Sequence, residues 1–260
     1  MSEDGINRVA LVTGANRGIG LAIFKAFYHS NYTVIGTYRS ASGEEILNNI
    51  ITDESRGVAM RMDVTSKDDV ADVFQAIRDK YGPVATLVNN AGITQDNLFM
   101  RMKNEEWDEV INTNLNSIFR VTKESIKDMV KSKYGRIINI ISISVKSPID
   151  NLGVSNTVRW AMASWAKTLS NEVAEYGITV NNVLPGFTIT ERLKKLINTN
   201  AKTQKIDPVK IEDNYKNIIP SKRFGEPEEV ASLVTFLSSK KAGYINGINI
   251  PVDGGYLSNL

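Results

Sequence analysis

Short runs of apolar, β-rich residues alternate along the chain with longer stretches in which apolar positions recur about every 3.6 residues. The short runs predict strands over residues 9–13, 33–37, 58–63, 86–89, 136–142, 179–184 and 244–252. The longer patterns predict helices over residues 68–81, 105–132 and 155–176. Alternation of this kind favours βαβ units, and therefore an α/β fold with a doubly wound parallel sheet and helices on both faces.

The stretch Glu191–Phe224 is polar and rich in lysine, and it shows no clear period. We expect an irregular segment here, between the sixth and seventh strands. At Glu226-Pro227 a helix is predicted to restart, because proline and acidic residues suit a first turn. We find no internal repeat or linker, so residues 1–260 are expected to form a single domain.

Composition narrows the class of protein. The 260 residues are 42% apolar, enough for one substantial core. The 31 basic side chains are nearly matched by 29 acidic ones, so charge gives no reason to expect nucleic acid or membrane binding. Cysteine is absent and the only histidine is His29, so we expect no metal site. No apolar stretch resembles a signal or a membrane span, and a cytoplasmic protein is expected.

The first predicted strand runs directly into a glycine-rich turn and then a helical pattern. The turn reads Thr13-Gly14-Ala15-Asn16-Arg17-Gly18-Ile19-Gly20. Glycines in this place let the backbone approach a pyrophosphate whose charge sits at the helix N-terminus. The position between strand and helix, more than the glycines themselves, predicts a dinucleotide site.

The spacing T-G-x-x-x-G-I-G resembles that of the short-chain dehydrogenase/reductase family, and further motifs follow in the family's order. They are Asp63-Val64, Asn89-Asn90-Ala91-Gly92, Asn114 and Pro185-Gly186-Phe187-Thr188-Ile189-Thr190. The resemblance implies a Rossmann-type fold with a nucleotide-binding part over about residues 8–142 and a substrate-covering segment over about residues 187–224. It implies cofactor contacts from Gly14, Asn16, Arg17, Gly18, Ile19, Gly20, Arg39, Asp63, Val64, Asn90, Ala91, Gly92, Arg159, Pro185, Gly186, Thr188 and Thr190.

Within this family the segment from Gly92 to Trp107 is similar to 3-oxoacyl-acyl-carrier-protein reductases. That resemblance implies an NADPH-dependent oxidoreductase, usually a homotetramer, that reduces a β-ketoacyl thioester. In those enzymes two basic residues dock the acyl carrier near the active-site entrance. Lys133 matches one of them, but Tyr176 stands at the other, which puts carrier specificity in doubt.

The second predicted strand ends in Gly36-Thr37-Tyr38-Arg39, without the acid that selects NAD by binding the ribose hydroxyls. Arg39 and Arg17 would instead suit a 2′-phosphate, which prefers bidentate guanidinium partners. We therefore expect NADP(H) as the cofactor.

The resemblance implies four catalytic positions. Asn114 and Ser142 match the family's asparagine and serine. The family's tyrosine, thirteen residues after the serine, falls on Ser155, and its lysine, four residues later, falls on Arg159. Counting back from Gly177 through an unbroken helix gives the same register. No tyrosine lies between Tyr134 and Tyr176, so none can take the place of the missing one.

A serine is a poor substitute for a tyrosine that protonates the substrate oxygen. Its hydroxyl reaches roughly 4 Å less far from the backbone, a gap that about one water could fill. A positioned general acid contributes about 10²–10⁴-fold to the rate, so its loss would impair carbonyl reduction more than cofactor binding. Arg159 can still hold ribose hydroxyls, but it is not expected to release a proton.

Three interpretations remain open. The first is a reductase with a changed proton route, acting on a small carbonyl or enone substrate or on an acyl thioester. The second is a catalytically impaired cofactor-binding subunit that forms a heterotetramer with an active homologue. The third, non-redox chemistry as in halohydrin dehalogenases, is matched only by Arg159. The resemblance also places Trp160 and Trp165 on the helix that often forms a subunit interface in this family, and buried aromatic packing is expected there rather than a substrate cage.

Overall fold

The computed structural model describes residues 8–30 and 32–258. Residues 1–7, which contributed to the expectation of a cytoplasmic protein, lie outside the described residues. No helix within the described ranges combines the length and the apolar character needed to span a membrane.

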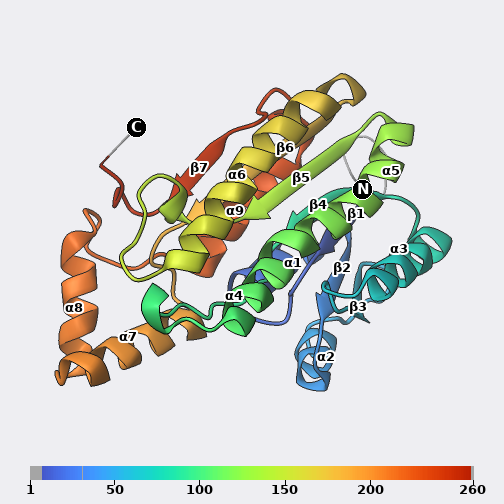
Figure 1. Ribbon diagram of the computed structural model, residues 1–260. Helices are drawn as coiled ribbons and strands as arrows, with labels where there is room; N and C mark the ends of the chain where they lie inside the picture. Colours follow the sequence, from blue (N-terminus) through green and yellow to red (C-terminus); the bar gives the residue numbers. More distant parts are fainter. Residues whose placement is uncertain (1–7, 31, 259–260) are drawn as a thin grey trace.

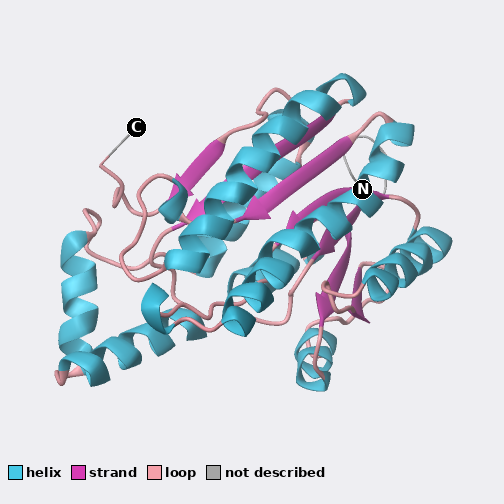
Figure 2. Ribbon diagram, in the orientation of Figure 1, coloured by secondary structure: helices cyan, strands magenta, loops and turns pink. Residues whose placement is uncertain are grey.

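Within the described ranges, seven parallel strands form one sheet in the order β3-β2-β1-β4-β5-β6-β7 (Figures 1 and 2). The strands are β1 Arg8–Val12, β2 Tyr32–Tyr38, β3 Gly57–Arg61, β4 Val84–Asn89, β5 Gly135–Ile140, β6 Ile178–Pro185 and β7 Asn249–Val252. The direction of strand succession reverses between β1 and β4, and ligands of doubly wound folds bind outside the carboxyl ends of the strands at such a point. The expected fold class is confirmed.

Helices cover both faces of the sheet. One face carries α1 Gly18–Tyr28, α2 Ala41–Asn48 and α9 Pro227–Ser238, and the other carries α3 Lys67–Tyr81, α5 Ser117–Ser132 and α6 Gly153–Val173. Successive residues of β1 enter alternate layers: Ala10 and Val12 pack with α1, whereas Val9 and Leu11 pack with α3. Each face therefore has its own apolar core.

Four asparagines cross the sheet at matching register positions. Asn89 Nδ2 donates to Asn139 Oδ1 at 2.9 Å, Asn139 Nδ2 to Asn182 Oδ1 at 2.8 Å, and Asn182 Nδ2 to Asn249 Oδ1 at 2.7 Å. Asn89 also donates to the Thr122 hydroxyl of α5 at 3.1 Å. This asparagine ladder satisfies buried amides from β4 to β7 without water.

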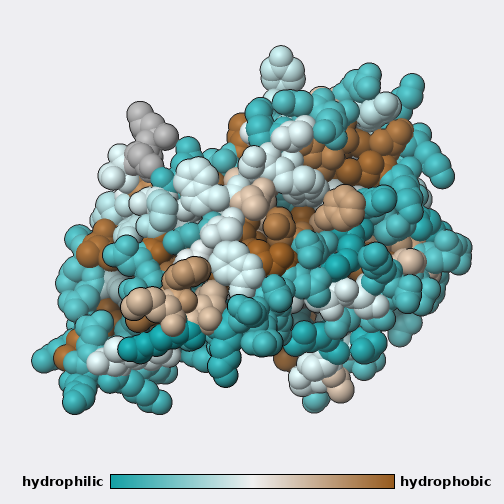
Figure 3. Space-filling model, in the orientation of Figure 1, coloured by the Kyte–Doolittle hydropathy of each residue, from teal (hydrophilic) through white to brown (hydrophobic). Residues whose placement is uncertain are grey.

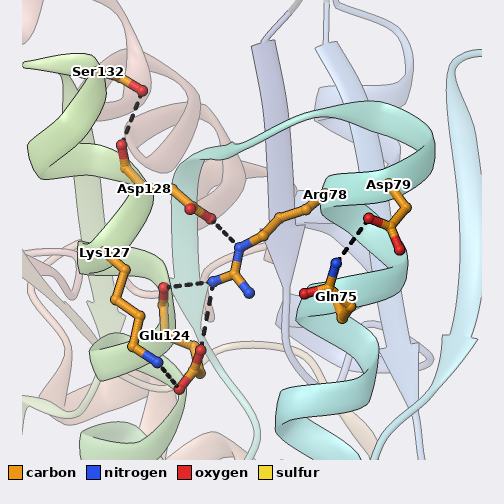
Figure 4. A network of polar contacts seen from close by, with 7 residues as sticks. All are labelled: Gln75, Arg78, Asp79, Glu124, Lys127, Asp128 and Ser132. Carbon is orange, nitrogen blue, oxygen red and sulfur yellow. Dashed lines mark hydrogen bonds and ion pairs between the residues drawn. The ribbon is translucent and has the colours of Figure 1, made fainter.

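A charged network joins α3 to α5 (Figure 4). Arg78 Nε donates to Asp128 Oδ2 at 2.8 Å, and Nη2 donates to the Glu124 carbonyl oxygen at 3.1 Å. Lys127 Nζ bonds Glu124 Oε1 at 2.6 Å. Burial alone would raise the pKa of Glu124, but the bonds from Lys127 and Arg78 hold it below its ordinary value.

The sequence expectation of an irregular segment was wrong for most of residues 191–224, which form two helices. The helices are α7 Glu191–Gln204 and α8 Pro208–Ile218. Thr190 caps α7 by accepting from the Leu193 N–H at 3.3 Å, and Asp207 caps α8. Their apolar side chains form a separate small core, and Figure 1 shows the pair projecting beyond the sheet.

Three further boundaries differ from the expectations. The last strand covers only Asn249–Val252, because residues 244–248 are not extended strand but irregular chain. β5 ends at Ile140, so Ser142 follows the strand and begins a short 3₁₀ turn, Ile143–Val145. The helical stretch 105–132 is divided into α4 Asn104–Ile111, a π turn Asn112–Asn116, and α5.

Helices α5 and α6 present aromatic side chains to solvent. Phe119 is 57% exposed and Trp160 is 49% exposed, whereas Trp165 packs partly buried against the sheet. The Trp160 indole N–H donates to the Ser144 carbonyl oxygen at 2.9 Å. Figure 3 shows apolar side chains among hydrophilic ones on the face that these helices cover. Trp160 is thus not buried within the single chain.

A candidate nucleotide and reaction site

The turn between β1 and α1 forms a close-packed cradle. Gly14 and Gly18 have positive φ angles of 63° and 52°, which favour glycine. A Cβ on Gly14 would lie 3.0 Å from the Ala91 Cα atom, and one on Gly20 would lie 2.4 Å from the Gly14 carbonyl oxygen. The glycines are therefore required by the backbone and its neighbours.

Residues after β4 hold this turn in place. Asn90 Nδ2 donates to the carbonyl oxygens of Thr13 and Gly14 at 2.9 and 3.0 Å. The Thr13 hydroxyl accepts from the N–H groups of Asn90 and Ala91 at 2.9 and 3.0 Å. The switch point between β1 and β4 is thus fixed by side-chain bonds to backbone groups.

The N-terminus of α1 is open to an anion. Arg17 is the residue before its first turn and makes no side-chain capping bond, so the first N–H groups of the helix remain available. Arg17 and Arg39 are both exposed, and no acid stands at the end of β2. A bound pyrophosphate with a further phosphate nearby fits this arrangement of donors and positive charge.

Asp63 follows β3 near Arg39. Its Oδ1 accepts from the Thr65 N–H at 2.9 Å and from the Thr65 hydroxyl at 2.7 Å. Burial alone would raise the pKa of Asp63, but these bonds and the charges of Arg39 and Arg61 lower it overall. Asp63 is therefore an ordered acceptor at the edge of the cradle.

The segment after β6 closes the cradle from the other side. Gly186 donates its N–H to the Val252 carbonyl oxygen at 3.0 Å, and a Cβ on Gly18 would lie 3.2 Å from Thr190 Cγ2. The N-terminus of α7 is thereby brought next to the N-terminus of α1. The cofactor candidates 185–190 thus meet those of the glycine turn.

Asn114 is 1% exposed and lies in the π turn between α4 and α5. Its Oδ1 accepts from the Ile93 N–H at 2.8 Å, and its Nδ2 donates to the Ile93 carbonyl oxygen at 2.8 Å. π turns occur often at functional sites, since they interrupt the regular helical bonding. Here the asparagine side chain fixes the loop that follows Gly92.

The two serines have different environments. Ser142 Oγ accepts from the Ser144 N–H at 3.1 Å and remains partly exposed. Ser155 is 5% exposed, in the first turn of α6, and its hydroxyl donates to Asp96 Oδ2 at 2.5 Å. The Ser155 N–H also donates to Asp96 Oδ1 at 3.1 Å. Ser155 is thus no mere surface residue of its helix.

Two guanidinium groups lie near the same carboxylate. Desolvation lowers the pKa of Arg159 to about 9, repulsion from Arg192 adds to the lowering, and Asp96 partly opposes both. Desolvation also lowers the pKa of Arg192, again opposed by Asp96. Arg192 nevertheless keeps exposed surface. Two cations act on one carboxylate, so a further anionic group placed beside them would be stabilised.

Arg159 lies one helical turn after Ser155 and points to the end of β5. Its Nη1 donates to the Ile140 carbonyl oxygen at 3.3 Å. A Cβ on Gly92 would lie 3.1 Å from Asn114 Oδ1 and 3.8 Å from Arg159 Nη2. Asn114, Gly92 and Arg159 therefore meet at the carboxyl ends of β4 and β5.

The structure brings the candidate catalytic and cofactor residues to the carboxyl ends of the strands. Asp96 and Arg192 were missed by the sequence reasoning; the only local sign of Asp96 was its place in the segment 92–107. Lys133 and Tyr176, by contrast, come just before β5 and β6 and so lie at the amino ends of these strands. Whether an acyl carrier docks beside them stays a prediction.

Within the described ranges, no three or more His, Asp or Glu side chains lie close enough together to hold a metal ion. Known proteins supply an independent comparison. Residues 14–257 match the family described as enoyl-(acyl carrier protein) reductase.

The chain is 42% identical to the 3-oxoacyl-[acyl-carrier-protein] reductase of Vibrio cholerae over 250 residues, covering 95% of this chain and 96% of the relative. It is 39% identical to the enzyme of that name from Escherichia coli over 253 residues, covering 95% and 96%. Among solved structures, an actinorhodin polyketide ketoreductase with NADPH has a TM-score of 0.93 and 30% identity, covering 97% and 98%. L-sorbose reductase of Gluconobacter frateurii, in complex with NADPH and L-sorbose, has a TM-score of 0.90 and 28% identity, covering 98% of each chain.

Proposed function

This chain belongs to the short-chain dehydrogenase/reductase family, and from that premise we propose an NADP(H)-dependent oxidoreductase with an altered proton route. One observation carries the cofactor proposal. The glycine cradle ends at an uncapped helix N-terminus, with Arg17 and Arg39 exposed beside it and no acid at the end of β2. The relatives solved with NADPH support the same cofactor.

The nucleotide-binding part is proposed to cover about residues 8–142. The pyrophosphate would lie against the turn from Gly14 to Gly20, and the 2′-phosphate against Arg17 and Arg39. The remaining contacts are proposed for Asn16, Ile19, Asp63, Val64, Asn90, Ala91, Gly92, Arg159, Pro185, Gly186, Thr188 and Thr190. When bound, the cofactor supplies the two-electron reducing equivalent, and the chain must supply the proton.

We assign the reaction centre to Asn114, Ser142, Ser155 and Arg159. Ser142 and Ser155 would hydrogen-bond the substrate oxygen, and Arg159 would hold the ribose and add positive charge. The substrate proposed is a small carbonyl or enone compound, or an acyl thioester. α7 and α8, within residues 187–224, would cover it.

An acyl-carrier substrate is the less favoured of these choices. Tyr176 stands where the resembling reductases have one of their two basic residues. Lys133, which matches the other, lies at the amino ends of the strands, away from the site of this chain. A homotetramer is the proposed assembly.

The alternative is a cofactor-binding subunit that pairs with an active homologue. The observation in its favour is that Ser155 stands where a tyrosine is expected, while the nucleotide cradle is retained. Such a subunit would bind NADPH without turning over substrate alone.

The test is a titration of purified protein with NADPH and with NADH, followed by turnover assays on the same sample. The panel should contain ketones, enones and β-ketoacyl thioesters. Tight binding of NADPH over NADH with turnover of one class supports the proposal. Binding without turnover supports the alternative, and absence of binding contradicts both.

A further inference from the structure

Asp96 holds Ser155 by two hydrogen bonds across 59 residues of sequence. The hydroxyl bond, at 2.5 Å, is in the range of charge-assisted bonds, which are shorter and stronger than neutral ones. Asp96 lies in the loop after β4 and Ser155 in the first turn of α6. The aspartate thus reaches the position at which the family has its tyrosine.

The direction of the bonds defines what Ser155 can do. Both are donated to Asp96, one from the backbone N–H and one from the hydroxyl. The Ser155 hydrogen therefore points to Asp96, while the oxygen's lone pairs remain free. In this state the serine oxygen can accept a hydrogen bond from a substrate hydroxyl. When Ser155 takes up the substrate proton, the Asp96 carboxylate can accept the proton that Ser155 gives up.

We propose that Asp96 and Ser155 form the proton-transfer pair of this site, with Asp96 as a positioning residue that stores the proton and acts through Ser155. The proposal depends on the oxidoreductase function proposed above, because it names the proton donor of that reaction. It accounts for a serine at a position where a lone serine is too short and too weakly acidic.

The step balances in both directions. In alcohol oxidation the substrate O–H bond breaks and its proton goes to Ser155 Oγ, while the original Ser155 proton goes to Asp96 Oδ2; the carbon's hydrogen leaves with two electrons to NADP⁺. In reduction the protonated Asp96 returns its proton to Ser155, which protonates the former carbonyl oxygen. Asp96 is partly exposed, so solvent can restore its proton.

The charges that face Asp96 come from two elements. Arg159 projects from α6, and Arg192 projects from α7. Each guanidinium attracts the carboxylate through its charge. Because reduction takes up a proton and oxidation releases one, the rate of reduction should fall as the pH rises and the rate of oxidation should show the opposite trend.

The first experiment compares Asp96→Asn with Asp150→Asn, a matched change at an exposed position five residues before Ser155. Steady-state rates are measured in both directions from pH 5 to pH 9. We expect Asp96→Asn to lose about tenfold to a thousandfold in kcat, to lose the pH trend, and to keep its KM for NADPH. Asp150→Asn should behave as the unmodified protein. Retention of kcat and of the pH trend in Asp96→Asn would overturn the proposal.

The second experiment needs no turnover. The chain has no cysteine, so Ser155→Cys introduces a single thiol. Its alkylation by iodoacetamide is followed against pH, alone and combined with Asp96→Asn. An adjacent carboxylate disfavours the thiolate, so the alkylation midpoint should lie at least about one pH unit lower in the double variant.

The two experiments separate the two possible failures. If the unmodified protein turns over no substrate, the proposed function fails, and the alkylation curves still decide whether Asp96 and residue 155 are coupled. Coincident curves would refute the proton-transfer pair even in an active enzyme.

Discussion

At the scale of single residues, the cradle depends on side chains that are absent. Gly20 leaves no room for a Cβ, because the Gly14 carbonyl oxygen and the Asn90 amide already fill the space. Gly153, at the start of α6, has nothing within 4 Å of the place where a Cβ would be. The two glycines therefore form a matched pair, one confined and one free.

Gly20→Ala should weaken NADPH binding at least tenfold and destabilise the fold by about 1–3 kcal/mol, since the turn must shift to admit the methyl group. Gly153→Ala should leave both unchanged or slightly improve stability. Fluorescence titration with NADPH and urea unfolding measure the two effects. Equal behaviour of both variants would contradict the close packing described for the turn.

Arg39 is the residue on which the choice between the nicotinamide cofactors should depend. Arg39→Ala should raise the Kd for NADPH about tenfold or more, as expected for loss of a charge-assisted bond, and leave the Kd for NADH nearly unchanged. Arg39→Asp should reverse the preference, because a carboxylate repels the phosphate and binds ribose hydroxyls. An equal loss for both cofactors would show that Arg39 acts on the fold instead.

At the scale of elements, the contact between α3 and α5 depends on Arg78, whose partners come from both the side chains and the backbone of α5 (Figure 4). Asp128 is only 8% exposed, so removal of the guanidinium leaves a carboxylate without its main partner. Arg78→Ala should therefore cost about 1–3 kcal/mol at neutral pH.

That cost should depend on pH. The folded-state pKa of Glu124 lies below its ordinary 4.5, so its ion pairs stabilise the fold above that value and lose this effect as the pH falls through the folded-state pKa. Thermal unfolding at pH 7 and at pH 3 measures the change. The difference between Arg78→Ala and the unmodified protein should shrink at the lower pH; a constant difference would mean that Arg78 acts mainly through packing.

The whole molecule presents an aromatic surface on α5 and α6 that a tetramer of the family's type would cover. Phe119→Glu should convert tetramers to smaller species, because it would bury an unpaired charge at that interface. Val209→Glu, at an exposed position on α8, should leave the assembly intact. Analytical ultracentrifugation distinguishes these outcomes, and a tetramer that survives Phe119→Glu would exclude α5 as the interface.

The sequence was sufficient for the sheet and for the glycine turn, because each depends on local periodicity or on spacing along the chain. The placing of Ser155 and Arg159 at the family's tyrosine and lysine positions stays a prediction. The sequence was insufficient for the contact between Ser155 and Asp96, which requires the loop after β4 to fold over the start of α6. It also missed α7 and α8. Their lysine-rich composition hid the buried positions Leu193, Ile197 and Ala201, although Thr190 and Asp207 are regular capping residues.

The side-chain amides of the asparagine ladder all point the same way along the row. Every bond from Asn89 to Asn249 runs nitrogen to oxygen in the same direction, so the dipoles add along the row. One amide cannot reverse without setting two oxygens or two nitrogens against each other. The row therefore has two coherent orientations and costly mixed ones, and a change at the β7 edge would be felt at Asn89, next to the Asn90 amide that holds the glycine turn.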